Sequence, residues 1–237
     1  MDKCSLLYWW PLVFNSGVPV PKTEIIVLPE GHGIDIVDNP KILKEYEKRI
    51  DEIAAKLGYP MFFRTDLTSG KHQWAETCFV ANKEMLFKNI FNTIEFGYCA
   101  DIIGLQCNAL VFREYLDTEF LFKAFNKMPI TKERRLFVRD GVVECCHPYW
   151  PERAIEHADN ENWKDLLDKT NMIYENDDKI LKIFGKKICD AVGGGYWSID
   201  FLFTRKYGWV LIDMAEGYCS FMPGRKSYHW DNCPRNH

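Results

Sequence analysis

The stretch Trp197-Ser-Ile-Asp-Phe-Leu-Phe-Thr-Arg-Lys-Tyr-Gly-Trp-Val-Leu-Ile-Asp-Met-Ala-Glu-Gly217 decides the fold of this chain. Two runs rich in aromatic and β-branched residues flank a polar cluster, which predicts a β-hairpin. An even-length turn would pair Thr204 with Trp209 and place Asp200 opposite Asp213. Like charges so placed are destabilising, and a hard cation such as Mg²⁺ would relieve the repulsion. The alternative is a hairpin whose carboxylates both point into water.

The composition indicates a well-packed globular protein. The chain has 237 residues, of which 47% are hydrophobic and 15% aromatic, enough for a sizeable core. A formal net charge of −4 argues against a general nucleic-acid binder, and no apolar run is long enough to span a bilayer. The nine irregularly spaced cysteines are typical of reduced, mostly buried thiols, so we expect a cytoplasmic protein without membrane or general nucleic-acid partners.

The order of the expected elements predicts an α+β fold with antiparallel hairpins rather than a regular βαβ series. Asn39 and Pro40 can begin a helix that Gly58 ends, and Asp140-Gly141 can form the tight turn of a second hairpin. The other expected elements are strands at Glu24–Leu28, Thr77–Val80 and Ala109–Leu116, and helices at Lys83–Phe96 and Asp177–Val192.

A second candidate functional segment runs from Arg64 to Lys71. A short buried strand delivers Arg64, and a Thr68-Ser-Gly turn then delivers Lys71. A small glycine-containing loop with two nearby cations suits contact with phosphate oxygens. A solvated turn with ordinary surface charges is the equally plain alternative. In the second hairpin, alternation places Arg135 on the same face as Phe137 and Arg139.

Some cysteine and histidine residues could suggest a zinc site instead, but their positions give it little support. Cys145-Cys146-His147 looks suggestive, yet adjacent cysteines in a strand point to opposite faces. Cys219, His229 and Cys233 lack the spacing of a zinc-binding pair.

Taken together, the motifs resemble those of the ATP-grasp superfamily. Gly17-Val-Pro-Val-Pro-Lys-Thr23 resembles its strand entry, and Tyr59-Pro-Met-Phe-Phe-Arg64 resembles a strand that ends in a nucleotide-contacting cation. Thr68-Ser-Gly-Lys71 is similar to its phosphate-covering loop, and Phe112-Arg-Glu-Tyr-Leu116 to the hinge that meets adenine. The resemblance, which runs from about residue 15 to 225, implies two α+β subdomains with the nucleotide held between them.

Arg64 and Arg135 narrow the resemblance to the clade with two arginines and one lysine, common in phage genomes. The chain is also similar to the eukaryotic cell-division-cycle proteins that assist assembly of a translation initiation factor. The resemblance implies catalytic roles toward ATP phosphates for Arg64, Lys71 and Arg135. It also implies nucleotide contacts by Phe112, Arg113, Glu114 and Tyr115, and Mg²⁺ ligation by Asp200 and Asp213.

Two departures from the family pattern bear on function. Ala215 stands where the metal strand usually carries an asparagine, which puts a second metal in question, and alternation points Glu216 to the opposite face. Few residues precede the Gly17 motif, so we expect no separate substrate domain before the lid. The acceptor site would then be open, completed by a partner, or built from residues 144–170, and an open site favours a protein or peptide.

These observations predict three segments: 1–58 packing on the core, 59–116 as a lid-like subdomain, and 117–237 as the core subdomain with the metal-binding hairpin. The expected activity is an ATP- and Mg²⁺-dependent ligase that joins a carboxylate to an amine or thiol through an acyl phosphate. One alternative is an ATP-binding assembly factor without ligase turnover. Another is a retaining glycosidase, because two close carboxylates also suit that mechanism, although the surrounding cations oppose a raised-pKa general acid.

Overall fold

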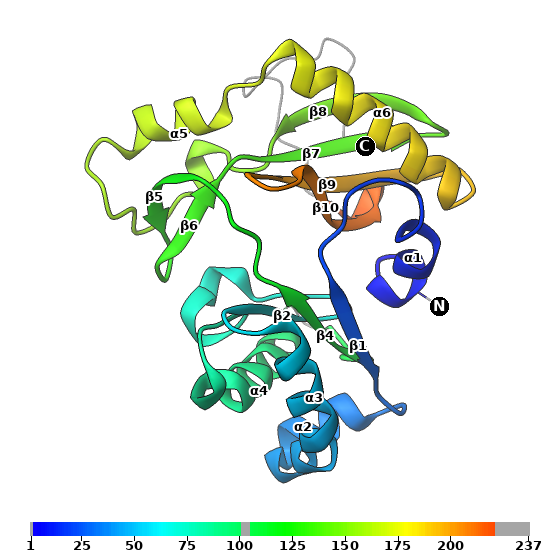
Figure 1. Cartoon of the computed structure of the whole chain (residues 1–237), viewed down its shortest axis with the longest axis vertical. Coiled ribbons are helices and arrows are strands. Elements are labelled where there is room, and N and C mark those ends of the chain that lie inside the picture. The colour runs from blue at the N-terminus through cyan, green and yellow to red at the C-terminus, as the bar shows by residue number, and fades with distance from the viewer. Residues whose placement is uncertain (1, 101–104, 221–237) are drawn as a thin grey trace. The chain divides into compact units, whose positions relative to one another are not determined.

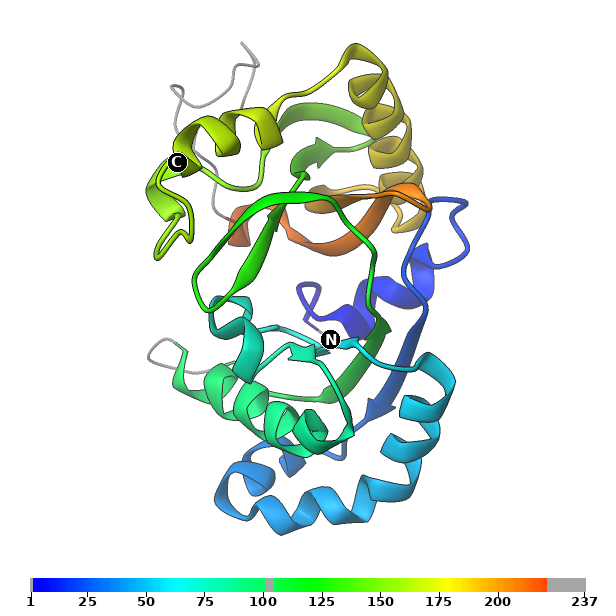
Figure 2. The same cartoon turned by 60° about the vertical axis from the view of Figure 1, so that its left-hand side comes forward.

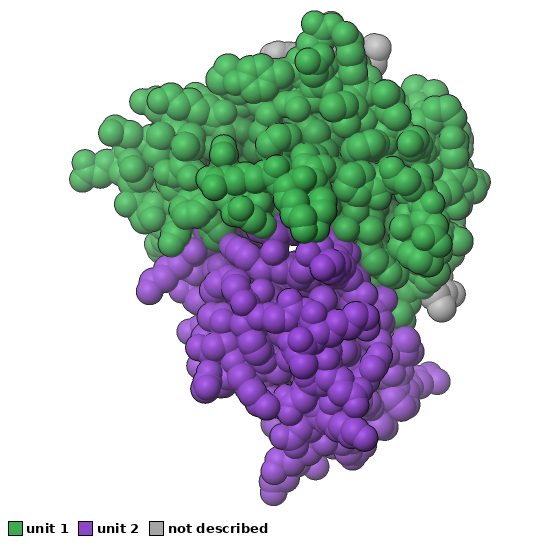
Figure 3. Space-filling model, in the orientation of Figure 1, with its two compact units in different colours: residues 1–20, 117–124, 129–237 green, residues 21–116, 125–128 purple. Residues whose placement is uncertain are grey.

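The computed structural model describes residues 2–100 and 105–220 (Figure 1). It divides into two compact units, coloured in Figure 3. Unit 1 comprises the described parts of residues 1–20, 117–124 and 129–237, and unit 2 comprises those of residues 21–116 and 125–128.

Unit 2 is built on a four-stranded antiparallel sheet in the order β1-β4-β2-β3. Figure 2 shows the unit from a second side, with β1 in blue and β4 in green. Strand β4 lies inside the sheet and pairs on one side with β1 and on the other with β2. The strands are β1 (Thr23–Val27), β2 (Met61–Thr65), β3 (Phe79–Val80) and β4 (Ala109–Glu114).

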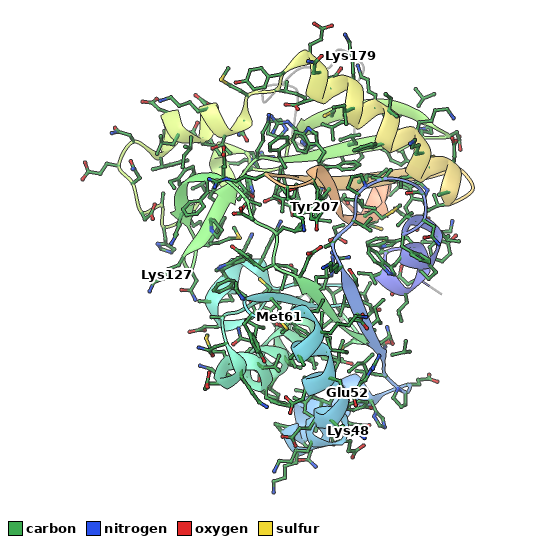
Figure 4. All side chains as sticks on the ribbon, viewed as in Figure 1. Lys48, Glu52, Met61, Lys127, Lys179 and Tyr207 are labelled. Carbon is green, nitrogen blue, oxygen red and sulfur yellow. The ribbon has the colours of Figure 1, made fainter. Side chains whose placement is uncertain are left out.

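Helices cover one face of this sheet and form the core of unit 2 with it. Met61, labelled in Figure 4, is fully buried on β2 in this core, as is Phe112 on β4. Each such side chain contributes about 1.5–3 kcal/mol by burial. The helical segments are α2 (His32–Asp38), η1 (Pro40–Tyr46), α3 (Glu47–Leu57), η2 (Lys71–Glu76) and α4 (Lys83–Cys99).

The helix predicted between Asn39 and Gly58 begins and ends where expected, but only its second half is an α-helix. The Asn39 side chain accepts a hydrogen bond from the Lys41 amide, and Gly58 follows the last helical residue in a positive-φ conformation. The first half, η1, is a 3₁₀ helix, and α3 begins only at Glu47. The short helix α2 precedes Asn39.

Unit 1 contains a second four-stranded antiparallel sheet, in the order β10-β9-β7-β8. Its strands are β7 (Glu133–Arg139), β8 (Val142–Pro148), β9 (Tyr196–Thr204) and β10 (Gly208–Glu216). Asp140-Gly141 forms the turn between β7 and β8, as predicted. A separate two-stranded sheet pairs β5 (Phe120–Ala124) with β6 (Met128–Thr131).

One face of this sheet is covered by α6, which crosses β7 and β8 in Figure 1. The close approach depends on Gly185, where an added Cβ would lie 3.1 Å from both Leu136 Cδ2 and Val143 Cγ2. The helical segments of the unit are α1 (Leu6–Val13), η3 (Glu152–Ala154), α5 (Trp163–Asn171), α6 (Glu175–Ala191) and η4 (Gly217–Cys219).

The register of the β9–β10 hairpin explains why Asp200 and Asp213 are cross-strand partners. Thr204 pairs with Gly208, not with Trp209 as expected, and the loop that contains Tyr207 (labelled in Figure 4) is one residue shorter than predicted. A β-bulge between Leu211 and Asp213 then shifts the register by one residue and places Asp213 opposite Asp200. The aspartate pairing is confirmed, but the predicted turn is wrong.

The structure bears on two expectations from composition, one about the cysteines and one about membrane-spanning segments. Among residues 2–100 and 105–220, seven cysteines are free thiols, whereas Cys145 is disulfide-bonded, so the expectation of reduced thiols is wrong for Cys145. Within residues 2–100 and 105–220, none of the helices has the length and apolar character needed to cross a membrane. His229 and Cys233, considered above for zinc, lie outside the described residues.

Candidate functional site

A row of four polar side chains crosses the unit 1 sheet on the face opposite α6. Arg135 on β7 pairs with Asp200 on β9, and Asp200 pairs with Asp213 on β10. On the other side of Arg135, His147 is its partner on β8. Cross-strand partners point to the same face of a sheet, so the four strands present His147, Arg135, Asp200 and Asp213 side by side.

Arg135 and Asp200 form a bidentate ion pair. Arg135 Nε donates to Asp200 Oδ1 and Nη2 donates to Oδ2, each at 2.7 Å. Burial alone would lower the pKa of the guanidinium, but the charge of Asp200 outweighs it and raises that pKa above its usual value. The expectation that Asp200 is repelled by Asp213 until a metal binds is therefore wrong, because Arg135 already supplies the positive charge.

His147 is a site residue that the sequence did not single out for this row. It is 4% exposed, and its Nδ1 donates to the carbonyl oxygen of Pro148 at 2.9 Å. Its Nε2 is buried and has no hydrogen-bond partner among the described residues. Burial, reinforced by the charge of Arg135, lowers the pKa of His147 to about 4, so the ring is neutral and Nε2 is an acceptor.

The position next to the row carries no metal ligand. Ala215 on β10 pairs with Ser198 on β9, and its carbonyl accepts a hydrogen bond from Ser198 Oγ at 3.4 Å. Glu216 points to the opposite face, where its carboxylate lies 3.4 Å from Lys3 Nζ. The bulge that re-aims Asp213 precedes it in the strand, so it leaves Glu216 on that opposite face.

The donor set of the row fits Mg²⁺. Mg²⁺ prefers oxygen ligands and is commonly held by one or two carboxylates together with phosphate oxygens. The Asp213 Oδ1 accepts a hydrogen bond from the Met214 amide at 3.0 Å, and a carboxylate has about four lone-pair sites in all. Asp200 likewise retains acceptor capacity beyond its two bonds to Arg135.

In unit 2, the charges of Arg64 and Lys71 act on the same thiol. Arg64 is 4% exposed on β2, and its Nε donates to the Thr65 carbonyl at 3.0 Å. Burial raises the pKa of Cys78 to about 12, while the charges of Lys71 and Arg64 both act in the opposite direction. The charges of the two cations predicted from the sequence thus both act on Cys78.

The loop before Lys71 is held by its own hydrogen bonds. Thr65 Oγ1 accepts from the Thr68 amide at 3.0 Å, and Thr77 Oγ1 donates to the Gly70 carbonyl at 2.8 Å. Gly70 has φ of 58°, a left-handed conformation that glycine adopts without strain. Lys71 then opens the 3₁₀ helix η2.

The four predicted hinge residues have different environments. Phe112 packs in the core of unit 2, whereas Arg113 points to the other face of β4, opposite Phe62 on β2. Glu114 accepts a hydrogen bond from the Lys22 amide at 2.8 Å, and Tyr115 follows the last residue of the strand.

Tyr115 belongs to an aromatic group that the sequence analysis missed. Its ring centroid lies 5.3 Å from that of Phe79, and Trp74 stacks on Phe79 at 5.5 Å. Phe62 completes the group, 6.0 Å from Trp74. These rings come from three segments of the chain, so no single motif could reveal them.

Comparison with known proteins identifies the family. The matching family model describes an ATP-grasp domain, family 3 of the clade with two arginines and one lysine, and it matches residues 32–232. No curated protein gives a significant match.

Solved structures share the fold at low sequence identity. A RimK domain ATP-grasp protein from Sphaerobacter thermophilus has a TM-score of 0.52 at 12% identity, covering 91% of this chain and 58% of its own. The VanG D-Ala:D-Ser ligase from Enterococcus faecalis has 0.54 at 15%, covering 87% and 50%. The D-alanine–D-alanine ligase from Bacillus anthracis, solved in complex with ATP, has 0.51 at 10%, covering 91% and 54%.

This chain therefore spans between half and three-fifths of the length of those solved chains. The family match, in contrast, covers most of the chain itself. The predicted ATP-grasp fold is confirmed, and the chain belongs to the ATP-grasp superfamily, as a member of family 3 of the clade with two arginines and one lysine.

Proposed function

We propose that this chain is an ATP- and Mg²⁺-dependent ligase that joins a carboxylate to an amine or a thiol. The observation that carries the proposal is the row of Arg135, Asp200 and Asp213 across three strands of an ATP-grasp protein. The ATP-grasp proteins named above as D-Ala:D-Ser and D-alanine–D-alanine ligases support the reaction class.

Phosphoryl transfer depends mainly on positioning and on neutralising charge at the transferred group. Arg64 and Lys71 would bind phosphate oxygens, and Arg135 would add a third cation whose direction is fixed by Asp200. A guanidinium held in this way is pre-organised, so little side-chain entropy remains to be lost when a phosphate binds.

Asp200 and Asp213 would hold the Mg²⁺ ion, which supplies charge neutralisation for the phosphates when bound. The donor carboxylate would attack the γ-phosphorus and release ADP, forming an acyl phosphate. The amine or thiol would then attack the acyl carbon, and phosphate would leave.

Tyr115 and the other aromatic rings of its group would contribute to adenine binding beside the strand end, together with the backbone that follows Glu114. Aromatic side chains stack on nucleobases with little dependence on base identity. Nucleotide preference would then come from hydrogen bonds to the backbone, which a comparison of ATP with GTP can measure.

The test couples nucleotide turnover to a covalent product. Purified protein is incubated with Mg²⁺–ATP and pools of carboxylates, amines and peptides, and ADP release is measured beside mass spectrometry of the products. We expect ADP release that depends on an acceptor and matches adduct formation. Asp213→Asn should reduce it at least about 100-fold, comparable to the loss of one charge-stabilising group. Asp165→Asn, the same change at an exposed position on α5, should not.

The assembly-factor alternative predicts a different outcome from the same experiment. Mg²⁺–ATP would bind and protect the protein, but no pool would yield an adduct and ADP release would stay at background. The observation that favours this alternative is Ala215, which offers no side-chain ligand for a second metal next to the row. ATP binding without any adduct would replace the ligase proposal with the assembly-factor one.

A further inference from the structure

The two ends of the described chain bring three metal-binding side chains together, away from the row. The Cys4 sulfur, a Glu216 carboxylate oxygen and the Cys219 sulfur all lie within 4.8 Å of one another. Cys4 precedes α1, Glu216 ends β10, and Cys219 ends η4. We propose that Cys4, Glu216 and Cys219 bind one Zn²⁺ ion, with a fourth coordination position open to water.

The chemistry of the donors selects zinc rather than magnesium. Thiolates are soft ligands that favour Zn²⁺, whereas Mg²⁺ takes oxygen ligands. Tetrahedral coordination with Zn–S bonds of about 2.3 Å and Zn–O bonds of about 2.0–2.2 Å requires ligand atoms less than about 4 Å apart. The observed separations require only a small contraction around the ion.

The groups around Cys4, Glu216 and Cys219 are compatible with Zn²⁺ bound by two thiolates. The Glu216 backbone is hydrogen-bonded to the Cys4 sulfur, the kind of contact that stabilises a thiolate. Two thiolates, one carboxylate and Zn²⁺ carry a net charge of −1, and Lys3 Nζ, 3.4 Å from the Glu216 carboxylate, balances it. Lys3 is thus placed as an outer partner of the site.

In the metal-free state, the surroundings of Cys4 favour its protonated thiol. Burial raises the pKa of Cys4 to about 12, and the hydrogen bond between its thiol and that of Cys219 acts in the same direction. Binding of a metal by the Cys4 thiolate would therefore release the proton of that thiol. Affinity should accordingly rise steeply with pH.

The N-terminal segment is already docked where the ion would hold it. Leu6, Trp9 and Val13 of α1 are fully buried, and Tyr8 stacks on Trp197 with ring centroids 6.1 Å apart. A metal bound by Cys4 and Cys219 would join this segment to the end of β10, three residues after Asp213. The site would thus stabilise the strand that carries the proposed Mg²⁺ ligand.

Cobalt titration provides the test. Reduced, metal-free protein is titrated with Co²⁺ in the presence of excess Mg²⁺, and thiolate-to-cobalt charge-transfer bands and visible bands of tetrahedral Co²⁺ are recorded. We expect one equivalent to bind and Zn²⁺ to displace it. Cys4→Ser and Cys219→Ser should each weaken binding by at least ~100-fold, the upper end of what losing an outer partner costs. Cys99→Ser, at an exposed free cysteine of α4, is the matched control and should bind like wild type.

Alkylation of the folded protein gives a second readout that needs no variant. Zn²⁺ should slow labelling of Cys4 and Cys219 by N-ethylmaleimide and leave Cys99 unaffected. The proposal is overturned if the cobalt bands persist when Cys4 and Cys219 are both serine, or if Zn²⁺ protects neither thiol. It is also overturned if the reduced protein takes up no metal and oxidation instead yields a Cys4–Cys219 disulfide.

Discussion

Asp200 lies between a cation, Arg135, and another carboxylate, Asp213, and it is hydrogen-bonded to the cation. Its carboxylate is 7% exposed and receives two bonds of 2.7 Å from Arg135, while Asp213 is its neighbour on the other strand. Removing one member of a buried ion pair leaves the other charge desolvated, which costs about 3–5 kcal/mol. The two aspartates should therefore differ in their effect on stability, although they are cross-strand partners.

We predict that Asp200→Asn lowers the free energy of unfolding of the metal-free protein by about 3–5 kcal/mol. Asp213→Asn should cost less than about 1 kcal/mol, because an asparagine can still accept from the Met214 amide. Urea denaturation of both variants in EDTA measures the difference. If both variants were as stable as wild type, Arg135 would not depend on Asp200, and mutual repulsion of the aspartates would again be the better account.

His147 gives the row a pH dependence whose sign follows from its buried neutral ring. In the unfolded chain it binds a proton below its ordinary pKa of about 6.5, but in the folded chain only below about 4. Between these values the unfolded state binds more protons, so stability falls as the pH is lowered. The loss should be on the order of 3 kcal/mol between pH 7 and pH 4.

Chemical denaturation of wild type and His147→Gln across that pH range measures this contribution. The difference in unfolding free energy between the two proteins should change with pH between about 6.5 and 4 and be constant above it. Parallel curves over the whole range would mean that His147 is protonated in the folded protein as easily as in the unfolded one.

At the scale of elements, two β-bulges decide which side chains reach the row. One lies between Leu211 and Asp213, and the other lies between Phe137 and Val138, on the β7–β8 pair. Without the second bulge, strict alternation from the Asp140-Gly141 turn would pair Arg135 with Cys146 instead of His147. Bulges commonly re-aim side chains next to functional sites.

The bulges also mark the limit of prediction from sequence. Alternation and turn chemistry predicted both hairpins and brought Arg135, Asp200 and Asp213 into consideration. Alternation cannot predict where a strand gains an extra residue, so His147 was missed and the turn at Tyr207 was misjudged. The aromatic group around Tyr115 and the contact of Cys4 with Cys219 depend on tertiary structure and have no local signal.

The packing of α6 on the sheet allows a test at the same scale. Gly185→Ala would normally stabilise a helix by up to about 1 kcal/mol. Here the new methyl group would lie 3.1–3.2 Å from methyl carbons of Leu136, Val138 and Val143. Overpacking costs about 1–3 kcal/mol, so we expect net destabilisation of up to about 2 kcal/mol in urea. Lys187→Ala, at an exposed position of α6, should change stability by less than about 0.5 kcal/mol, and stabilisation by Gly185→Ala would show that the helix can move outward.

At the scale of the whole molecule, the proposed nucleotide-binding residues are contributed by both units. Arg64 and Lys71 belong to unit 2, and Arg135, Asp200 and Asp213 belong to unit 1. Each unit has its own sheet and its own covering helices. Binding of one Mg²⁺–ATP should therefore depend on residues from either unit, independently of the stability of each sheet.

Thermal denaturation tests this dependence. Mg²⁺–ATP at about 100 times its Kd should stabilise wild type by about 2.7 kcal/mol, or roughly 5–10 °C in Tm. Lys71→Ala in unit 2 and Asp213→Asn in unit 1 should each remove most of this shift while leaving the Tm in EDTA nearly unchanged. The controls make the same changes at exposed positions, Lys88→Ala on α4 and Asp165→Asn on α5, and should keep the full shift. If only the unit 2 variant lost the shift, the nucleotide would be bound without the row, and Asp213 would have to act after binding, on the transferred phosphoryl group.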